Sequence, residues 1–451
     1  MKTVFIPIFQ GVEARNILRS DVFKILKGKE IRIVLFVSSG EKKEYFEKEF
    51  GGDDIIYEIT PSYRPFFLNK IFSLLKFNLI NTKTVDLKHR MKFEQDKNFI
   101  LFGFKLLFNR IFARKIFRKI VRFLDYFLAW DGTYRRYFEK YQPDLVFLAH
   151  LFGDDEISFL KEAKRRKIKS IGLITSWDKI TGRCMIRLLP DKLVVYNDVV
   201  KKEAVRFVDI DSKDIEVVGI PQYDFYFKNK PEERNMFYRG LGIAGDKKIV
   251  VFAPSGRERG DADRSLIRMI YHILNSELKR FNVQLVVRFP PNDKVDLDPD
   301  LLDMGIIYQR PGYKFSGERG VDWDLDFSDL QGLVNILSYS DMMISLTSSI
   351  AIDAALFDKP VINIKFSDLG RYPLMKKPIR YFETEHYSKL INTGGVTVVK
   401  DEEDLAYWMK KYLENQSLNS EGRKKMVSQQ CWKHDGQAGL RMANFILDFL
   451  D

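Results

Sequence analysis

The chain has 451 residues, of which 45% are hydrophobic, and it carries a formal net charge of +12. This length predicts two α/β domains, and the charge favours an anionic partner such as a nucleotide, a nucleic acid or a phospholipid surface. Two cysteines exclude a disulfide framework, and no apolar run approaches the ~20 residues of a membrane-spanning helix. The apolar run at residues 4–8 is too short for a signal peptide, so we expect a cytoplasmic protein, soluble or peripheral.

The first half of the chain alternates predicted strands and helices. Residues 4–8 form a first buried strand, Gly11 turns the chain into a helix that runs to about Lys27, and residues 31–37 form a second strand. This β-α-β spacing is typical of a parallel sheet with a right-handed crossover. Further strands are predicted at 144–148, 171–175, 192–196 and 216–218.

Residues 64–130 interrupt that alternation with a basic, Phe-rich segment, and 105–124 is predicted to be helical. In it, one cationic stripe repeats every four residues and an apolar set lies on another side: Arg110, Arg114, Arg118 and Arg122 against Phe112, Ile116, Ile120 and Phe123. Such a helix suits an anionic membrane surface, so we expect 105–124 to hold the protein at the inner face of the membrane. The alternative is a core-packed helix with a solvated charged face.

The second half repeats the α/β pattern after a charged, irregular segment at 228–246, which we interpret as an interdomain linker. Strands are predicted at 248–253 and 284–288, a long polar loop at 311–328 and a helix at 329–339. We therefore expect two Rossmann-like domains that face a central cleft. The predicted units are 1–235, including the basic insertion at 64–130, then 236–430, and a closing helix at 431–451.

The segment 340–364 carries the strongest functional signal. It is predicted as a strand, a hydroxyl-rich turn at Thr347, Ser348 and Ser349, a helix that Lys359-Pro360 ends, and a second strand. Amides and hydroxyls at a helix start favour an anion, and Asp353 lies on the same helix face as Ser349. A nucleotide diphosphate on the serines with a ribose hydroxyl on Asp353 fits this geometry, although ordinary helix capping is the alternative.

These segments resemble those of GT-B glycosyltransferases, especially the CDP-glycerol glycerophosphotransferases and the UDP-GlcNAc 2-epimerases. Residues 251–257 are similar to the "YAPT.R" strand and loop of the glycerophosphotransferases. Residues 287–290 are similar to their "R.HP" strand end with Phe289 in place of the histidine, and 346–349 align with "DYSS" without its aspartate. Segments 175–181 and 218–224 are similar to "SWDN" and "G.PQFD" of bacterial surface-polysaccharide transferases. The resemblance implies the GT-B architecture and an enzyme that works without a bound metal.

Breaking a bond to a nucleotide phosphate requires stabilisation of the charge on the leaving group. We assign this role to the backbone amides and hydroxyls of Ser348 and Ser349, with Arg257 or Arg288 as the cation. Both arginines follow predicted strand ends, where ligands of parallel sheets bind, and Ser255 is also placed at this donor site. Each arginine could equally be a surface ion-pair partner. The acidic run 322–326 lies in the predicted loop and is expected to be solvated rather than to bind a metal.

An inverting transfer also needs a base that deprotonates the acceptor hydroxyl. The candidates are Glu13 at a helix start, Asp178 after a strand and a tryptophan, and His150 at a strand end. Each has a structural alternative: Glu13 can stabilise the helix dipole, Asp178 can cap a turn, and His150 can be a satisfied core histidine.

The leading hypothesis is a glycosyltransferase that moves a sugar from a UDP-, GDP-, CDP- or CMP-linked donor to a lipid-linked surface glycan. No permanently bound cofactor is expected. The enzymatic alternatives are a CDP-glycerol-type polyol-phosphate transferase, against which Phe289 counts, and a UDP-sugar 2-epimerase. A basic nucleic-acid-binding protein would explain the charge, but no RNP, helix-turn-helix or zinc-finger pattern supports it, so no nucleic acid partner is expected.

Overall fold

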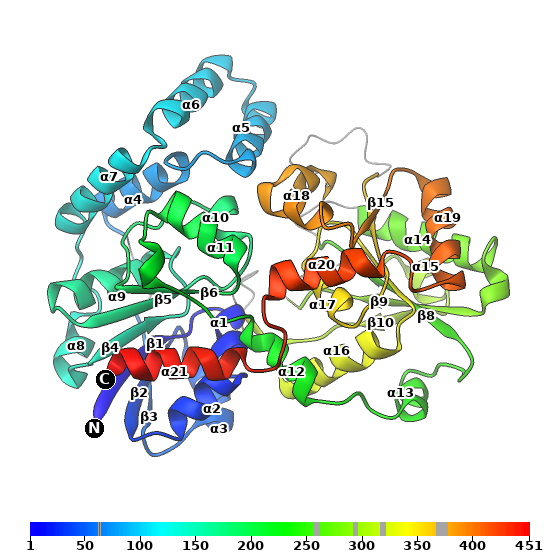
Figure 1. Ribbon diagram of the computed structural model, residues 1–451, viewed down its shortest axis with the longest axis horizontal. Helices are drawn as coiled ribbons and strands as arrows, with labels where there is room; N and C mark the ends of the chain where they lie inside the picture. Colours follow the sequence, from blue (N-terminus) through cyan, green and yellow to red (C-terminus); the bar gives the residue numbers. More distant parts are fainter. Residues whose placement is uncertain (62, 64, 257–261, 292–295, 316–321, 367–377) are drawn as a thin grey trace.

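A computed structural model describes residues 1–451 except 62, 64, 257–261, 292–295, 316–321 and 367–377. It contains two parallel sheets, each covered by helices, which lie side by side as two lobes (Figure 1). The arrangement confirms the predicted fold class of two Rossmann-like halves. In the part of the chain that the structure covers, no helix is long and apolar enough to cross a membrane.

The first sheet has seven parallel strands in the order β3-β2-β1-β4-β5-β6-β7. Its central strands are almost wholly apolar because helices cover both faces. The strands are β1 Lys2–Pro7, β2 Ile31–Val37, β3 Ile55–Ile59, β4 Leu145–Leu148, β5 Lys169–Leu173, β6 Lys192–Val195 and β7 Ile215–Val217. The helices are α1 Gly11–Ile17, α2 Asp21–Lys27, α3 Gly40–Phe50, α8 Arg135–Tyr141, α9 Asp154–Arg165, α10 Lys179–Gly182, α11 Asp198–Glu203 and α12 Asp224–Lys228.

The second sheet has six parallel strands in the order β10-β9-β8-β13-β14-β15. Its strands are β8 Lys248–Ala253, β9 Val283–Arg288, β10 Ile307–Gln309, β13 Met342–Ser345, β14 Val361–Ile364 and β15 Thr397–Val399. Its helices are α13 Arg234–Gly240, α14 Ala262–Asn275, α15 Pro299–Leu302, α16 Phe327–Tyr339, α17 Ile350–Leu356, α18 Glu385–Ile391, α19 Glu402–Glu414 and α20 Ser420–Cys431. The predicted linker at 228–246 thus contains a short helix, α13.

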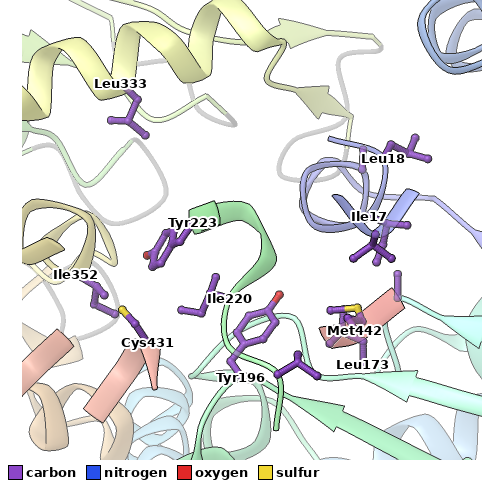
Figure 2. Close-up of a cluster of buried hydrophobic side chains, with 14 of the residues drawn as sticks. Ile17, Leu18, Leu173, Tyr196, Ile220, Tyr223, Leu333, Ile352, Cys431 and Met442 are labelled. Atoms are coloured by element: carbon purple, nitrogen blue, oxygen red, sulfur yellow. The ribbon is translucent and has the colours of Figure 1, made fainter. Parts of the chain in front are cut away.

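The last helix, α21 Ala438–Leu450, returns to the first sheet and packs on α2. The Asp224 carboxylate accepts hydrogen bonds from the amides of Ala438 at 3.0 Å and Gly439 at 2.7 Å. A continuous apolar core lies beneath the contact between the two halves. Figure 2 shows Ile17 and Met442 with Tyr223, and Leu333 and Ile352 from the second half, in one cluster.

Two local predictions are wrong near the contact between the two halves. The helix predicted to run to Lys27 is two helices, because Ser20 caps a new helix, α2. The predicted polar loop at 311–328 holds an antiparallel pair, β11 Tyr313–Lys314 and β12 Trp323–Asp324. Its acidic run is not solvated: Asp324 is fully buried on Arg19 at 2.5 Å, and Asp322 pairs with Lys42 at 2.6 Å. The basic partners, Arg19 and Lys42, come from the first half, so the sequence near residues 322–326 could not predict these ion pairs.

The basic insertion comprises α4 Phe67–Leu75, α5 Lys83–Asp96, α6 Phe99–Phe112 and α7 Lys115–Leu128. The predicted single helix 105–124 is therefore two helices, separated at residues 113–114. The single cationic stripe is also wrong, because Arg118 and Arg122 point inward and both bind Asp209, at 2.6 and 2.8 Å. The apolar side chains of α6 and α7 face outward instead. This outward face is formed by Phe104, Leu107, Ile111, Ile116, Ile120, Phe123 and Phe127.

Candidate functional site

A cavity of about 310 Å³ lies between the two halves. The first half contributes Arg15 from α1. The second half contributes the loops after β8 and β9, the start of α17, and Trp323 of β12. The carboxyl ends of parallel strands therefore frame the cavity, which is where open α/β sheets bind ligands. Five residues predicted from the sequence or its resemblances line it: Ser255, Arg288, Ser348, Ser349 and Asp353.

Arg288, the last residue of β9, is a buried cation in this cavity. Its guanidinium donates to the Gln309 side-chain oxygen at 2.9 Å and to the Asp329 carbonyl at 3.4 Å. Both partners are neutral, and Arg288 makes no carboxylate ion pair within the described part of the chain. Burial lowers its pKa to about 10, so the guanidinium remains charged at neutral pH. A charge buried this way is stabilised by an anionic ligand.

Arg15 is a second cation of the cavity, and sequence reasoning missed it. Its guanidinium lies over the ring of Trp323, 5.9 Å from the ring centre, and its Nε is buried without a hydrogen-bond partner among the described residues. Gly11 allows this approach, because a Cβ at that position would lie 2.0 Å from the Trp323 carbonyl oxygen. The available signal was the glycine turn followed by an arginine one helical turn later.

The hydroxyl-rich turn lies at the cavity wall. Ser348 is half-buried and Ser349 exposed, and both line the cavity, whereas Thr347 is buried behind them. Among the described residues, the Ser348 hydroxyl accepts only a long bond from the Ile350 amide, at 3.4 Å, and Ser349 makes no side-chain cap bond. Ordinary helix capping therefore leaves the Ser349 hydroxyl available to a ligand.

Asp353 lies one turn into α17, as predicted, on the cavity floor. Its carboxylate accepts hydrogen bonds from the hydroxyls of Tyr226 at 2.5 Å and Tyr223 at 3.3 Å. Burial raises the pKa of Asp353, which the two tyrosine hydrogen bonds and nearby Arg15 oppose. Sequence reasoning missed both tyrosines, although their spacing of three residues after β7 puts them on one side of a helical turn.

The remaining donor-site predictions differ in outcome. Ser255 is held by Asp263, whose carboxylate accepts a hydrogen bond from the Ser255 amide at 2.9 Å. Phe289, where the resembling families have histidine, is buried against the cavity and lies beside the guanidinium of Arg310, 4.0 Å from its ring centre. Arg257 lies outside the described residues.

Glu13 lies at the start of α1, away from Arg15 on the helix. Its Oε2 accepts hydrogen bonds from the amides of Phe9 at 2.6 Å and Gln10 at 3.0 Å, while Oε1 is buried without a partner among the described residues. Burial raises the pKa of Glu13 to about 7, against those hydrogen bonds and the positive charge of Lys179. Glu13 therefore caps the helix and also has the proton affinity of a base that works near neutral pH.

The other two base candidates have less suitable proton affinities. Burial alone would raise the pKa of Asp178, but His386, Lys179 and a hydrogen bond from Ser176 bring it down to about 2. His150 is buried, and that burial lowers its pKa well below the usual value. Trp177, next to Asp178, contacts His386 of the second half edge-on, with 5.0 Å between the ring centres. Asp178 therefore lies close to the contact between the two halves.

The sequence matches a known protein family. A family model described as CDP-Glycerol:Poly(glycerophosphate) glycerophosphotransferase matches residues 187–448, more than half of the chain. The teichoic acid poly(ribitol-phosphate) polymerase of Bacillus spizizenii is 25% identical over 175 residues, or 38% of this chain and 25% of that protein. The teichoic acid glycerol-phosphate primase of the same organism is 26% identical over 205 residues, or 45% of each chain. The matches thus span less than half of either relative.

Solved structures share the fold at low identity. The S. aureus MnaA–UDP co-structure has a TM-score of 0.54 with 14% identity and covers 100% of this chain and 97% of its own. UDP-GlcNAc 2-epimerase from Neisseria meningitidis bound to UDP-GlcNAc has a TM-score of 0.56 with 11% identity, over 99% and 100% of the two chains. These likenesses support the two-domain GT-B fold. Among the residues that the structure describes, no group of three or more His, Cys, Asp or Glu side chains could hold a metal ion.

Proposed function

The chain belongs to the CDP-glycerol:poly(glycerophosphate) glycerophosphotransferase family, and we propose that it transfers a nucleotide-activated group to a surface glycan. The observation that carries the proposal is the interdomain cavity, where two arginines without carboxylate ion pairs in the described ranges meet hydroxyls and a buried carboxylate. The family match favours neither the 2-epimerase nor the nucleic-acid-binding alternative.

The donor's diphosphate lies between Arg288 and Arg15, with the hydroxyls of Ser348 and Ser349 as further hydrogen-bond donors. Asp353 then accepts a hydrogen bond from a ribose hydroxyl. Guanidinium groups bind phosphate oxygens through two parallel hydrogen bonds, and their positive charge stabilises the leaving phosphate as the bond breaks. A cytidine diphosphate donor is the first choice, because the family description names CDP-glycerol.

Two kinds of transferred group fit the same arrangement. With a nucleotide sugar, the acceptor oxygen attacks the sugar carbon, and a nucleoside diphosphate leaves, or CMP if the donor is CMP-linked. With a CDP-linked polyol, the oxygen attacks the phosphorus next to the polyol and CMP leaves. In both cases Glu13 takes the proton of the acceptor hydroxyl, because its pKa of about 7 suits a base better than the values of Asp178 or His150.

The experiment is a donor panel read first by binding and then by product. UDP-, GDP-, CDP- and CMP-linked donors are tested for thermal stabilisation, and the donor that binds is incubated with a lipid-linked glycan primer. Release of CMP from a CDP-linked donor identifies polyol-phosphate transfer, whereas release of a nucleoside diphosphate, or of CMP from a CMP-linked donor, identifies sugar transfer. Absence of stabilisation by every nucleotide would refute the proposal.

The acceptor is lipid-linked in this proposal, and the outward apolar face of α6 and α7 holds the protein on an anionic membrane. Phe104 and Phe123 on that face are 61% and 63% exposed. Residues 97–124 contain no Asp or Glu, while Arg114, Lys115 and Lys119 are exposed. Apolar side chains flanked by basic ones bind the interface of anionic bilayers. The buried arginines Arg118 and Arg122 hold α7 to the protein rather than to lipid.

Flotation with vesicles that contain phosphatidylglycerol tests this surface. Leu107→Asp with Phe123→Asp should abolish flotation, because both charges would enter the hydrocarbon. The matched control is Met236→Asp with Leu302→Asp, two exposed apolar residues elsewhere, which should float like the wild type. Equal flotation of both double variants would refute the membrane surface.

A further inference from the structure

A second group of buried polar atoms lies in the first half, beyond the carboxyl ends of β1, β4 and β5. These strands are neighbours in the sheet. The atoms have no hydrogen-bond partner among the described residues: Glu13 Oε1, His150 Nδ1, Thr175 Oγ1 and Thr181 Oγ1. Buried polar groups are normally hydrogen-bonded, so a concentration of unpaired ones marks a place that water or a ligand completes.

Lys179 is the cation of this group. It follows β5 as the first residue of α10, and its side chain is buried, at 8% exposure. No residue of the described ranges forms an ion pair or hydrogen bond with its ammonium, although the charges of Asp178, Glu13 and Glu156 all act on it. Burial lowers the pKa of Lys179, with Asp178 as the main opposing charge. The ammonium therefore faces carboxyl groups that it does not touch.

We propose that Lys179 and Glu13 form the subsite for the acceptor hydroxyl, and that its ligand is a polyol or sugar. The inference rests on the proposed function and adds to it the side of the cleft that receives the acceptor. A hydroxyl matches both groups, because its oxygen accepts a hydrogen bond from the ammonium while its proton goes to Glu13 Oε1. Neighbouring hydroxyls of a polyol would meet Thr175 and His150.

The chemical step balances with these residues. The acceptor O–H bond breaks as its proton passes to Glu13, and the oxygen forms a bond to the electrophilic atom of the donor. The donor's bond to the leaving phosphate breaks, and its electron pair stays on the phosphate oxygen. Glu13 then releases its proton to solvent. Lys179 stabilises the negative charge that develops on the attacking oxygen.

Glu156 lies beside Glu13 and stays neutral during this step. It is buried on α9, and burial followed by the charge of Glu13 raises its pKa well above the usual value. The groups that face Glu13 are Glu156, Lys179 from α10 and Lys42 from α3, together with the amides of Phe9 and Gln10. Like charges disfavour joint ionisation, so Glu156 keeps its own proton while Glu13 ionises.

Steady-state kinetics of Lys179→Met test the subsite, with Lys164→Met, a surface ion-pair lysine, as control. We expect kcat/KM for the acceptor to fall about 10- to 100-fold, the usual effect of losing a hydrogen bond from a charged group. The dissociation constant for the nucleotide should stay unchanged, which also shows that the variant folds. Methylammonium should partly restore activity to Lys179→Ala. Glu156→Gln keeps that position neutral, so it should leave the acid limb of the pH–rate profile unchanged.

The outcomes distinguish failure of the proposed function from failure of the acceptor subsite alone. If the wild type transfers nothing from any donor, the proposed function fails and this inference fails with it. If the wild type is active and Lys179→Met keeps the same acceptor kinetics, the inference alone is overturned. A shifted acid limb in Glu156→Gln would mean that Glu156 ionises beside Glu13 and would contradict its neutral state.

Discussion

Arg288 illustrates how a single residue can be arranged for a ligand rather than for stability. Its two protein partners are a side-chain amide and a backbone carbonyl, neither of which neutralises a buried charge. A buried cation without a carboxylate ion pair destabilises the empty protein even with Asp329 and Asp353 nearby, and a bound phosphate reverses that cost. The same residue should therefore lower stability without nucleotide and raise it with nucleotide.

Arg288→Met is predicted to weaken nucleotide binding about 100-fold, while the melting temperature of the free protein stays equal or rises. The loss corresponds to about 3 kcal/mol, the value of a charge-assisted hydrogen-bond pair. Titration calorimetry measures it, with Arg268→Met as the control, since Arg268 is a surface residue paired with Asp298 and Asp300. Unchanged affinity in Arg288→Met would show that the phosphates bind elsewhere.

Glu13 leads to a prediction about pH. Its folded-state pKa of about 7 lies above the ordinary value of 4.5, so its contribution favours folding below pH 4.5 and is lost as the pH rises through 7. Ionised Glu13 at pH 8 costs the fold about 3 kcal/mol. Glu13→Gln should abolish transfer, yet raise the melting temperature more at pH 8 than at pH 5.

Calorimetric scans of wild type and Glu13→Gln at the two pH values make the measurement. A variant that melts lower at pH 8, or that keeps its transfer activity, would contradict the assignment. Wild-type activity should also rise with pH through about 7, because only the ionised carboxylate accepts a proton.

Sequence reasoning found the site residues that follow a strand in their own half. Ser348, Arg288 and Asp353 were predicted because strand ends and helix periodicity are local signals. Arg15 and Tyr226 were missed, since they approach the cavity from other segments of the fold. No local pattern relates position 15 to position 323, and only the fold shows that Gly11 makes room for Trp323.

At the scale of elements, the orientation of α7 could also not be predicted from local sequence. Its periodicity correctly predicted an amphipathic helix, but it could not decide which face meets the protein. Asp209, far along the chain, decides it by binding both Arg118 and Arg122. Arg118 and Arg122 therefore turn inward and the apolar side outward, the reverse of an ordinary surface helix.

Asp209→Asn should destabilise the attachment of α7 by about 3 kcal/mol or more, because two buried guanidinium groups lose their carboxylate. Urea unfolding followed by tryptophan fluorescence measures the change, and Asp211→Asn, an exposed neighbour, is the control. We expect Asp211→Asn to unfold like the wild type. An equally small effect in Asp209→Asn would mean that the arginines do not hold the helix.

At the scale of the whole molecule, the β11–β12 pair joins the two halves. Arg19 and Asp324 are both fully buried in this contact, and Lys42 with Asp322 forms a second bridge beside it. The two-domain architecture was predictable from the repeated α/β rhythm. The contact between the halves was not, because its partners are hundreds of residues apart in the chain.

Asp324→Asn should loosen the two halves and weaken donor binding, since Arg15 and Trp323 reach the cavity through this contact. Small-angle X-ray scattering should give a larger radius of gyration than for the wild type, and saturating nucleotide should reduce the difference. Identical scattering curves for variant and wild type would show that the buried pair does not set the arrangement of the halves.

The central claim is that a nucleotide's phosphates occupy the cavity between α1 and α17. A crystal structure with CDP bound tests it most directly. The account predicts phosphate oxygens within hydrogen-bonding distance of the Arg288 and Arg15 guanidinium groups and the Ser348 or Ser349 hydroxyls. A nucleotide bound at another place, or an empty cavity at saturating CDP, would contradict it.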